Sequence, residues 1–313
     1  MAKIRVGLVG VGKIARDQHI PVIRASADFE LVACASQHSR VDGVVSFPTL
    51  EAMLAGSPEL DAIVICSEPQ LHYESAKRSL LAGKHVFMEK PPCSTTAQLD
   101  QLATLARDGH KTLFQTWHLR HAPRVDDAKR WLRSRKILGG RVIWKEDVRF
   151  WHPGQVWIWQ AGGYGVFDPG INAISILTKI LPEPVFVENA DLFFPENCDS
   201  PIAANLLFRT DSGTEIPAEF DFLYTGDGQW DIELETDDGK LALTAAATLM
   251  SVNGRKQEFP PSRDGVHVEY APLYRHFAEL VASEQSEVDA TPFRLVADAF
   301  LVGKRTTVAR FEE

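Results

Sequence analysis

The sequence predicts an α/β protein with two domains: a doubly wound parallel sheet, followed by an α+β domain with a large, mostly antiparallel sheet. In the first third of the chain, short β-branched runs alternate with helical segments, which is typical of parallel strands joined by helical crossovers. After His118 the strand-like segments follow one another closely, as in an antiparallel sheet. The 313 residues, of which 45% are apolar and 24% charged, suit two folded domains and exclude a disordered or fibrous chain.

The first predicted domain spans residues 1–118 and begins with a strand at 4–9. Ser94 is expected to cap the helix that starts at residue 95, because its hydroxyl can accept a hydrogen bond from a first-turn amide. The other strands are expected at 30–35, 62–66, 85–88 and 112–116, and the helices at 13–25, 50–55, 72–82 and 95–107.

The second predicted domain spans residues 119–313, where a helix at 123–133 leads into a long strand-like segment at 137–150. The sequence Asp237-Asp238-Gly239 predicts a tight hairpin turn. Further strands are expected at 185–192, 203–209, 214–222, 230–236, 240–243 and 249–252, and helices at 170–180, 270–283 and 292–308. These helices would cover one face of the sheet and leave the other free to pack against a second subunit or to face solvent. A homodimer through this face is therefore expected, with a solvated face as the alternative.

Charge and apolar patterning narrow the range of partners. Lysine and arginine number 33 against 42 aspartates and glutamates, a net charge of -9 that repels nucleic acid. The first residues lack the apolar core of a signal peptide, and no run approaches the roughly 20 apolar residues of a membrane span. We therefore expect a cytoplasmic protein without membrane contact. The cysteines form no CxxC pair, which predicts buried, reduced thiols and no zinc site or disulfide at Cys34, Cys66, Cys93 and Cys198.

A glycine-rich turn follows the first predicted strand and opens the first predicted helix. Gly10 permits the tight turn, Gly12 lets the backbone approach a pyrophosphate, and Ala15 still allows close packing of helix and strand. The helix N-terminus offers backbone amides to a phosphate. This placement predicts a dinucleotide-binding Rossmann domain, with a chance glycine turn as the alternative.

The loop after the second predicted strand indicates which cofactor is preferred. An acidic residue there usually binds the ribose hydroxyls of NAD. This loop reads Ser36-Gln37-His38-Ser39-Arg40, which has no carboxylate to repel a phosphate and offers hydroxyl, amide, imidazole and guanidinium donors that could bind one. We therefore predict a preference for NADP, with NAD also usable, unless these are ordinary turn residues. The cofactor contacts are expected from Gly10, Gly12, Lys13, Ile14, Ser36, Gln37, His38, Glu89 and Lys90.

Two polar positions lie where a ligand is expected. Lys90 stands directly after the strand at 85–88, at the sheet edge where such folds bind ligands, although a surface lysine in a turn is the alternative. Pro91 follows it, and its peptide bond is a candidate for the cis form. If a helix begins near Gly170, Asp168 and Asn172 can converge on one small ligand, unless Asp168 only caps that helix.

These motifs carry a family resemblance. The GxGxxA start, Glu89-Lys90-Pro91, and Asp168 with a polar residue four positions on resemble the Gfo/Idh/MocA family of NAD(P)-dependent oxidoreductases over essentially the whole chain. Five segments resemble its aldose 1-dehydrogenase branch, which contains D-galactose and L-arabinose 1-dehydrogenases. They are GKIARDQH at 12–19, WKEDVR at 144–149, WHPGQ at 151–155, FDPGINA at 167–173 and RLVAD at 294–298.

The resemblance implies oxidation of an aldopyranose at C1 to its lactone, with D-galactose or L-arabinose as substrate. Many family members carry histidine where this chain has Asn172, and asparagine cannot accept a proton. The aldose branch also has asparagine there, which assigns the proton to Asp168 and Lys90. We expect Asp168 to take or relay the proton, while Lys90 holds O1 and stabilises its developing negative charge or shares the proton.

Polar and aromatic residues suited to a sugar lie between 144 and 159. On a strand Glu146 and Asp147 face opposite ways, and we expect Glu146 to face the ligand and Asp147 to pair with Arg149. Trp144 and Trp157 are expected in the core. By resemblance the sugar pocket also includes His118, Trp151, His152, Asn172 and Trp230. No metal is expected, since the spacing of the histidines matches no metal motif and hydride transfer to a nicotinamide needs none.

Two other functions remain open at this stage. One is a family oxidoreductase acting on another polyol or sugar, such as an inositol, a deoxysugar or an oligosaccharide. The other is a regulator that senses NAD(P)(H) without catalysis. Such a regulator would keep the glycine turn but would not need Lys90 and Asp168 together.

Overall fold

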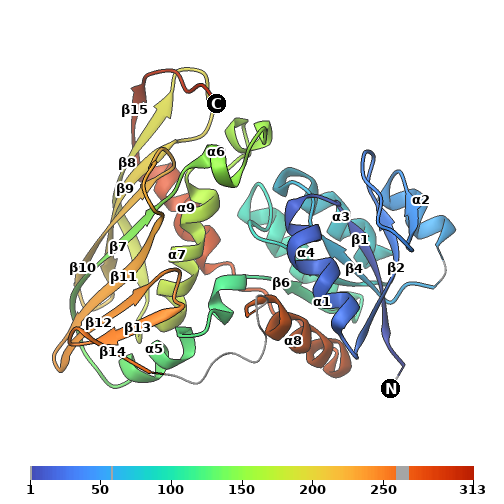
Figure 1. Cartoon of the computed structure of the whole chain (residues 1–313), viewed down its shortest axis with the longest axis horizontal. Helices are drawn as coiled ribbons and strands as arrows, with labels where there is room; N and C mark the ends of the chain where they lie inside the picture. The colour runs from blue at the N-terminus through green and yellow to red at the C-terminus, as the bar shows by residue number, and fades with distance from the viewer. Residues whose placement is uncertain (1, 58, 259–267) are drawn as a thin grey trace. The chain divides into compact units, whose positions relative to one another are not determined.

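A parallel sheet of six strands forms the centre of the N-terminal part of the computed structural model, which describes residues 2–57, 59–258 and 268–313 (Figure 1). Its strand order, β3-β2-β1-β4-β5-β6, is that of a doubly wound Rossmann fold, and the predicted fold class is confirmed. The order reverses between β1 and β4, where such sheets bind ligands at the carboxyl ends of the strands. The strands are β1 Ile4–Val9, β2 Phe29–Ala35, β3 Val45–Phe47, β4 Ala62–Ile65, β5 His85–Met88 and β6 Leu113–Gln115. The sequence analysis missed β3.

Helices connect the strands of this first sheet. The chain leaves β1 through the π-helix η1 (Ala15–His19) and α1 (Ile20–Ala25), and the later helices are α2 (Leu50–Gly56), α3 (Pro69–Leu81) and α4 (Thr96–Asp108). The cap of α4 is Thr95, so the prediction of Ser94 is wrong. The Thr95 hydroxyl accepts from the Gln98 amide, and the Gln98 side chain accepts in return from the Thr95 amide.

Helix α8 (Tyr270–Ser283) packs on the first sheet, not on the second as the sequence analysis expected. Phe277 stacks on Phe29 with ring centroids 5.9 Å apart and meets Phe87 edge-on at 5.5 Å. The described chain thus forms two units. One runs to His118 and includes α8 and the chain up to Ala290, and the other contains the rest, from Leu119 onward.

The second unit contains a mixed sheet of nine strands, counted within the described residues, in the order β14-β13-β12-β11-β7-β10-β9-β8-β15. All pairings are antiparallel except β10 with β7 and β15 with β8, as the predicted, mostly antiparallel sheet requires. The strands are β7 Ile137–Lys145, β8 Val185–Pro195, β9 Ala203–Thr210, β10 Glu215–Asp221, β11 Gln229–Thr236, β12 Gly239–Thr244, β13 Leu249–Val252, β14 Arg255–Lys256 and β15 Lys304–Val308. The predicted turn joins β11 to β12, with Thr236 paired with Gly239.

Two segments of the second unit differ from their predicted structure. The strand expected to reach residue 150 ends at Lys145, because Asp147 accepts a hydrogen bond from the Arg149 amide and caps the short helix α6 (Val148–Trp151). The helix expected to reach residue 308 ends at Val302, and β15 then extends the sheet beside β8.

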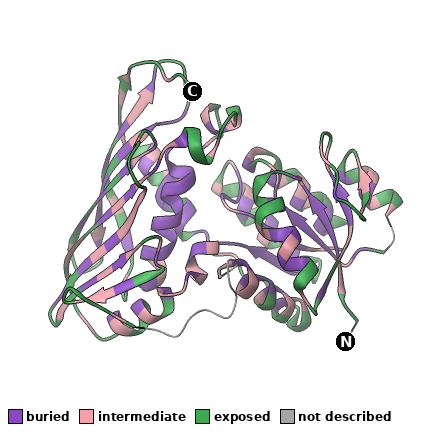
Figure 2. Cartoon of the chain, viewed as in Figure 1, coloured by how far each residue is buried: buried purple, intermediate pink, exposed green. Residues whose placement is uncertain are grey.

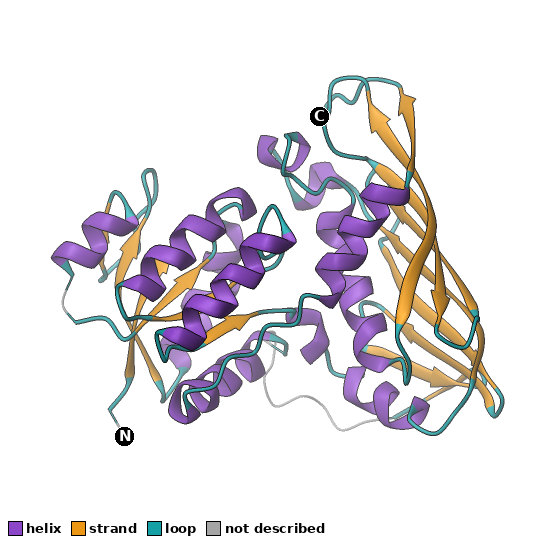
Figure 3. Ribbon diagram, turned by 180° about the vertical axis from the view of Figure 1, so that it is seen from behind, coloured by secondary structure: helices purple, strands orange, loops and turns teal. Residues whose placement is uncertain are grey.

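Helices cover one face of this second sheet (Figure 3). α7 (Phe167–Ile180) and α9 (Thr291–Val302) pack together, α5 (Val125–Leu132) packs on α7, and almost every residue of α7 is buried (Figure 2). The short 3-10 helices η2 (His118–His121) and η3 (Val156–Trp159) complete the structure. Along β10, buried and exposed residues alternate, so the other face of the strand is exposed and carries Glu215, Pro217 and Glu219.

The cysteines and the helix lengths relate to the expected buried thiols and to the expected lack of a membrane span. Cys34, Cys66 and Cys93 are buried as predicted, whereas Cys198 is half-buried, and none of these four described cysteines is joined to another by a disulfide. Over the residues that the structure describes, we find no helix with the length and apolar content needed to span a bilayer.

Candidate functional site

The turn after β1 has the geometry of a phosphate cradle. Gly10 has a φ of 87°, and a Cβ on it would lie 2.7 Å from the Ser67 amide nitrogen at the end of β4, so only glycine fits there. A Cβ on Gly12 would meet nothing within 4 Å, and Lys13 and Ile14 are exposed beside it. The backbone amides at the start of the helical segment after this turn therefore face open space, where the strand order reverses between β1 and β4. This arrangement fits the pyrophosphate of a dinucleotide.

The Lys13 ammonium has a partner of its own. It forms an ion pair with Asp17 one helical turn further on. The backbone of Lys13 belongs to the cradle, whereas its charge is partly neutralised, so its expected cofactor contact stays a prediction.

Guanidinium groups from the loop after β2 (Arg40) and from the helices after β1 (Arg16 and Arg24) line one hollow. Arg40 donates from Nη1 to the carbonyl oxygens of Ser36 and Ser39, at 3.2 and 3.1 Å. Arg16 donates to the carbonyl oxygen of Arg40 at 3.2 Å, and Gln37 and His38 are exposed on the same loop. A hollow of about 390 Å³ beside it is lined by Arg16, Ile20, Pro21, Arg24, Arg40, Val41 and Asp42. Sequence reasoning missed Arg16 and Arg24, because only the fold brings the first helix beside this loop.

Behind Lys90, the carboxylate of Glu89 is buried. It contacts His19 Nε2 at 3.1 Å and accepts from the Lys90 amide at 3.1 Å, while His19 Nδ1 lies 2.8 Å from the hydroxyl of Tyr274 on α8. Burial alone would raise the pKa of Glu89, but the hydrogen bond and charge of His19 outweigh it and lower that pKa to about 2. Glu89 thus holds the backbone of Lys90 from inside the unit, and its expected contact with a cofactor stays a prediction.

His72 fixes the loop beyond Lys90. Its two ring nitrogens lie 3.0 Å from the Pro91 carbonyl oxygen and 2.8 Å from the Ser67 carbonyl oxygen, so it joins the ends of β5 and β4. The peptide bond between Lys90 and Pro91 is cis. Full burial lowers the pKa of His72. No motif in the sequence indicated this residue.

His118 lies at the start of η2 in the first unit. Its Nδ1 is 3.5 Å from a carboxylate oxygen of Glu269, and its ring stacks on Tyr270 with centroids 5.5 Å apart. These contacts orient the imidazole of His118. Its expected contact with a sugar stays a prediction.

In the second unit, polar side chains gather at the start of α7. The helix begins at Phe167 with Val166 as its cap residue, so Asp168 lies inside the first turn and is not the cap. Asp168 is 2% and Asn172 8% exposed. The Oδ1 atom of Asn172 has no hydrogen-bond donor within reach among the described residues, which leaves a buried acceptor for a ligand hydroxyl. His152, just after α6, places Nε2 3.4 Å from Asp168 Oδ2.

A second group lies beyond the end of β7. Trp230 donates from Nε1 to the buried carboxylate of Glu146 at 2.8 Å, and its ring meets that of Trp151 edge-on at 5.9 Å. Trp151 is 39% exposed, as an aromatic surface for a ligand requires. Asp147 forms the expected ion pair with Arg149, at 2.9 Å.

The expected core tryptophans differ from each other. Trp144 is buried, as predicted. Trp157 is only half-buried, so its assignment to the core is wrong. Its indole nitrogen donates to Gln155 Oε1 at 3.2 Å.

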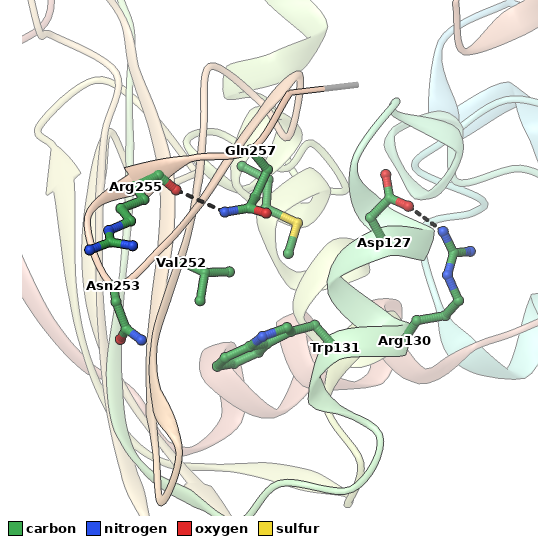
Figure 4. A pocket seen from close by; sticks show the side chains of 8 residues that line it. Asp127, Arg130, Trp131, Val252, Asn253, Arg255 and Gln257 are labelled. Atoms are coloured by element: carbon green, nitrogen blue, oxygen red, sulfur yellow. Dashed lines mark hydrogen bonds and ion pairs between the residues drawn. The ribbon is translucent and has the colours of Figure 1, made fainter. Parts of the chain in front are cut away.

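One large hollow contains none of the predicted site residues. It measures about 840 Å³ and lies between α5 and the β13–β14 edge of the second sheet (Figure 4). Its lining residues are Asp127, Arg130, Trp131, Met250, Val252, Asn253, Arg255 and Gln257.

Comparison with known proteins identifies the family. Residues 4–116 match the model of the Gfo/Idh/MocA oxidoreductase family, described by its NAD-binding Rossmann fold. The chain is 44% identical over 311 residues to galactose 1-dehydrogenase from Pseudomonas fluorescens, covering 99% of each sequence. The chain belongs to this oxidoreductase family.

Two solved structures resemble this chain. D-galactose-1-dehydrogenase from Rhizobium etli is 51% identical, with a TM-score of 0.93 over 100% of this chain and 99% of that one. A 3-ketoreductase from Actinomadura kijaniata, solved with NADP and TDP-benzene, has a TM-score of 0.83 at 22% identity over 98% of this chain and 100% of that one. The second likeness is one of fold alone.

We predict that Gly10→Ala weakens binding of NADH and NADPH about tenfold to a hundredfold, because the new Cβ would displace the end of β4 from the cradle. Fluorescence titration of each reduced cofactor measures this. Gly213→Ala is the matched control, since Gly213 has a similar φ of 91° but nothing within 4 Å of its Cβ position. Binding by Gly10→Ala within about twofold of wild type would contradict the role of the turn.

Proposed function

We propose that this protein oxidises an aldopyranose at C1 to its lactone with NADP or NAD, and that D-galactose or L-arabinose is the substrate. The full-length identity of 44% to a galactose 1-dehydrogenase carries this proposal. The two sugars differ only in the hydroxymethyl group at C5, and one pocket could discriminate between them by roughly 1 to 3 kcal/mol.

The chemistry assigns separate tasks to two residues. A bound nicotinamide cofactor supplies the acceptor for the hydride that leaves C1. The hydroxyl proton at C1 needs a base, and we assign its removal to Asp168, whose carboxylate is buried at the start of α7. We assign to Lys90 the stabilisation of the developing negative charge on O1, since the contact between Glu89 and the Lys90 amide supports its position.

The remaining polar and aromatic groups suit the other parts of a sugar. The unsatisfied Oδ1 of Asn172 supports an acceptor role toward one hydroxyl, and the Glu146 carboxylate beside Trp230 supports the same role toward another. Trp151 offers an exposed ring for the C–H face of the sugar. We propose these residues together with His118 and His152 as the sugar-binding set.

The guanidinium cluster supports NADP as the preferred cofactor. The described partners of Arg16, Arg24 and Arg40 are backbone carbonyl oxygens, so their charges are not cancelled by a carboxylate. Arg40 lies on the loop that meets the adenosine ribose in this fold. A 2′-phosphate there would gain charge-assisted hydrogen bonds from it.

We further propose that the protein is a cytoplasmic homodimer that associates through the face of the second sheet without helices. The exposed face of β10 supports association through this sheet, and the four free cysteines support a cytoplasmic location.

Incubating the protein with a panel of aldoses and either cofactor is expected to give reduced cofactor with D-galactose or L-arabinose. Lys90→Met and Asp168→Asn should each lower kcat about 10²-fold to 10⁴-fold, because each removes a group that acts on O1. The matched controls Lys129→Met and Asp126→Asn alter exposed charges on α5 and should keep the native rate. Near-native turnover by both site variants would rule out the assignment.

We predict that Arg40→Ala raises KM for NADP roughly 10-fold to 100-fold and changes KM for NAD less than about threefold, since only NADP carries the 2′-phosphate. Steady-state kinetics with both cofactors measures the difference. Arg133→Ala, an exposed arginine at the end of α5, serves as the control. Equal changes for both cofactors, or a strong wild-type preference for NAD, would contradict the proposal.

A further inference from the structure

The carboxylate of Asp168 has an imidazole beside it that comes from a different segment. Asn172, one helical turn further on in α7, cannot accept a proton. His152 follows α6, and its Nε2 lies 3.4 Å from Asp168 Oδ2. Contacts between catalytic groups are often this long before substrate binds. The pair therefore brings together two groups that can exchange a proton.

The neighbours of His152 determine which ring nitrogen carries the hydrogen. Trp157 donates its indole N–H to Gln155 Oε1 at 3.2 Å, and because an indole N–H can only donate, this atom of Gln155 must be the oxygen. The same oxygen lies 3.3 Å from His152 Nδ1. An amide oxygen can only accept, so Nδ1 must carry a hydrogen. In the neutral ring, Nε2 then has its lone pair directed toward Asp168.

We propose that His152 is a proton relay for Asp168 and that Gln155 is the positioning residue that keeps its Nε2 ready to accept. This inference rests on the proposed oxidation of a sugar at C1. The proton that Asp168 takes from the O1 hydroxyl passes from its carboxyl to His152 Nε2, which leaves Asp168 as a carboxylate beside an imidazolium. That proton then leaves Nε2 for water, while Nδ1 keeps its own hydrogen against Gln155.

The exposure of the two side chains favours release of the proton to water through His152. The side chain of Asp168 is 3% exposed and that of His152 is 20% exposed, so the imidazole is the member of the pair with better access to water. One edge of the ring meets Phe222, with centroids 5.7 Å apart, which keeps the ring in place. The charged groups on the surrounding elements include Asp168 of α7, Glu146 at the end of β7, and the Asp147–Arg149 pair at α6. The carboxylate of Glu313 also lies on the loop that carries His152, where it accepts from the Gly154 amide.

The first test is His152→Ala with added imidazole. The relay predicts that kcat for the sugar falls about 10²-fold or more and that free imidazole restores it about tenfold in a saturable way. His276→Ala, a substitution of a histidine on α8, should keep the native rate and show no response to imidazole. A kcat within about threefold of wild type, together with a raised KM for the sugar, would mean that His152 only binds substrate and would overturn the proposal.

The second test is Gln155→Glu, which keeps an acceptor oxygen against His152 Nδ1. This test does not depend on whether the His152→Ala variant folds. A carboxylate there stabilises the imidazolium, and His152 must be neutral to accept a proton. The acid limb of the kcat profile should therefore move to higher pH, by about one unit. Gln257→Glu, in the hollow of Figure 4, adds the same charge away from His152 and should leave the limb unchanged. An acid limb of Gln155→Glu that coincides with wild type would overturn the relay.

The wild-type rate in the same assay separates the two proposals. If wild type oxidises no aldose, the proposed function fails. If wild type is active and both His152→Ala and Gln155→Glu behave like it, only the relay fails.

Discussion

The buried contact between Glu89 and His19 joins the parts of the first unit that surround Lys90. His19 ends the π-helix that follows the glycine turn, Glu89 follows β5, and Tyr274 of α8 meets the other ring nitrogen of His19. A buried carboxylate costs free energy unless it is paired, and removing one member of such a pair typically costs about 3 to 5 kcal/mol. The network therefore links the cradle, the lysine and α8 in one polar core. It adds to the packing of Phe277 on Phe29 and Phe87, which places α8 in this unit.

The second unit orders its own carboxylate in a different way. Asp168 is buried in the first turn of α7 and faces His152, which Gln155 and Trp157 orient through a chain of hydrogen bonds. In the first unit, the buried carboxylate of Glu89 supports the backbone of Lys90. In the second unit, the oriented imidazole of His152 lies beside the carboxylate of Asp168. The proposed oxidation of a C–OH bond would use one group of each kind, the Lys90 ammonium and the Asp168 carboxylate.

Much of the architecture could be predicted because hydrophobic periodicity and turn residues report it directly. The parallel strands of the first sheet and the hairpin at Asp237-Asp238-Gly239 are examples. A strand of three residues such as β3 is too short to show a period. The amphipathic pattern of α8 indicates a packed helix but does not identify the sheet that it covers. The apolar residues after Asp147 are typical of a strand, but the Asp147 cap makes them the helix α6.

For the candidate site too, sequence patterns indicate some residues, whereas other contacts form only in the folded chain. Gly10, Lys90 and Asp168 could be selected because motifs place them at strand and helix ends, where the fold fixes the backbone. The Arg16–Arg40 contact, the clamp at His72 and the orientation of His152 by Gln155 depend on side chains that only the folded chain brings together. No spacing rule in the sequence indicates such contacts.

Oxidation at C1 of the sugar is the claim on which the functional account depends, and the fate of the hydrogen on that carbon tests it most directly. D-galactose labelled with deuterium at C1 can be incubated with the protein and oxidised cofactor, and the reduced cofactor then analysed by mass spectrometry. The account predicts that the reduced cofactor carries one deuterium and that the sugar product has lost it. Reduced cofactor without deuterium, formed while the label stays in the sugar, would contradict the account.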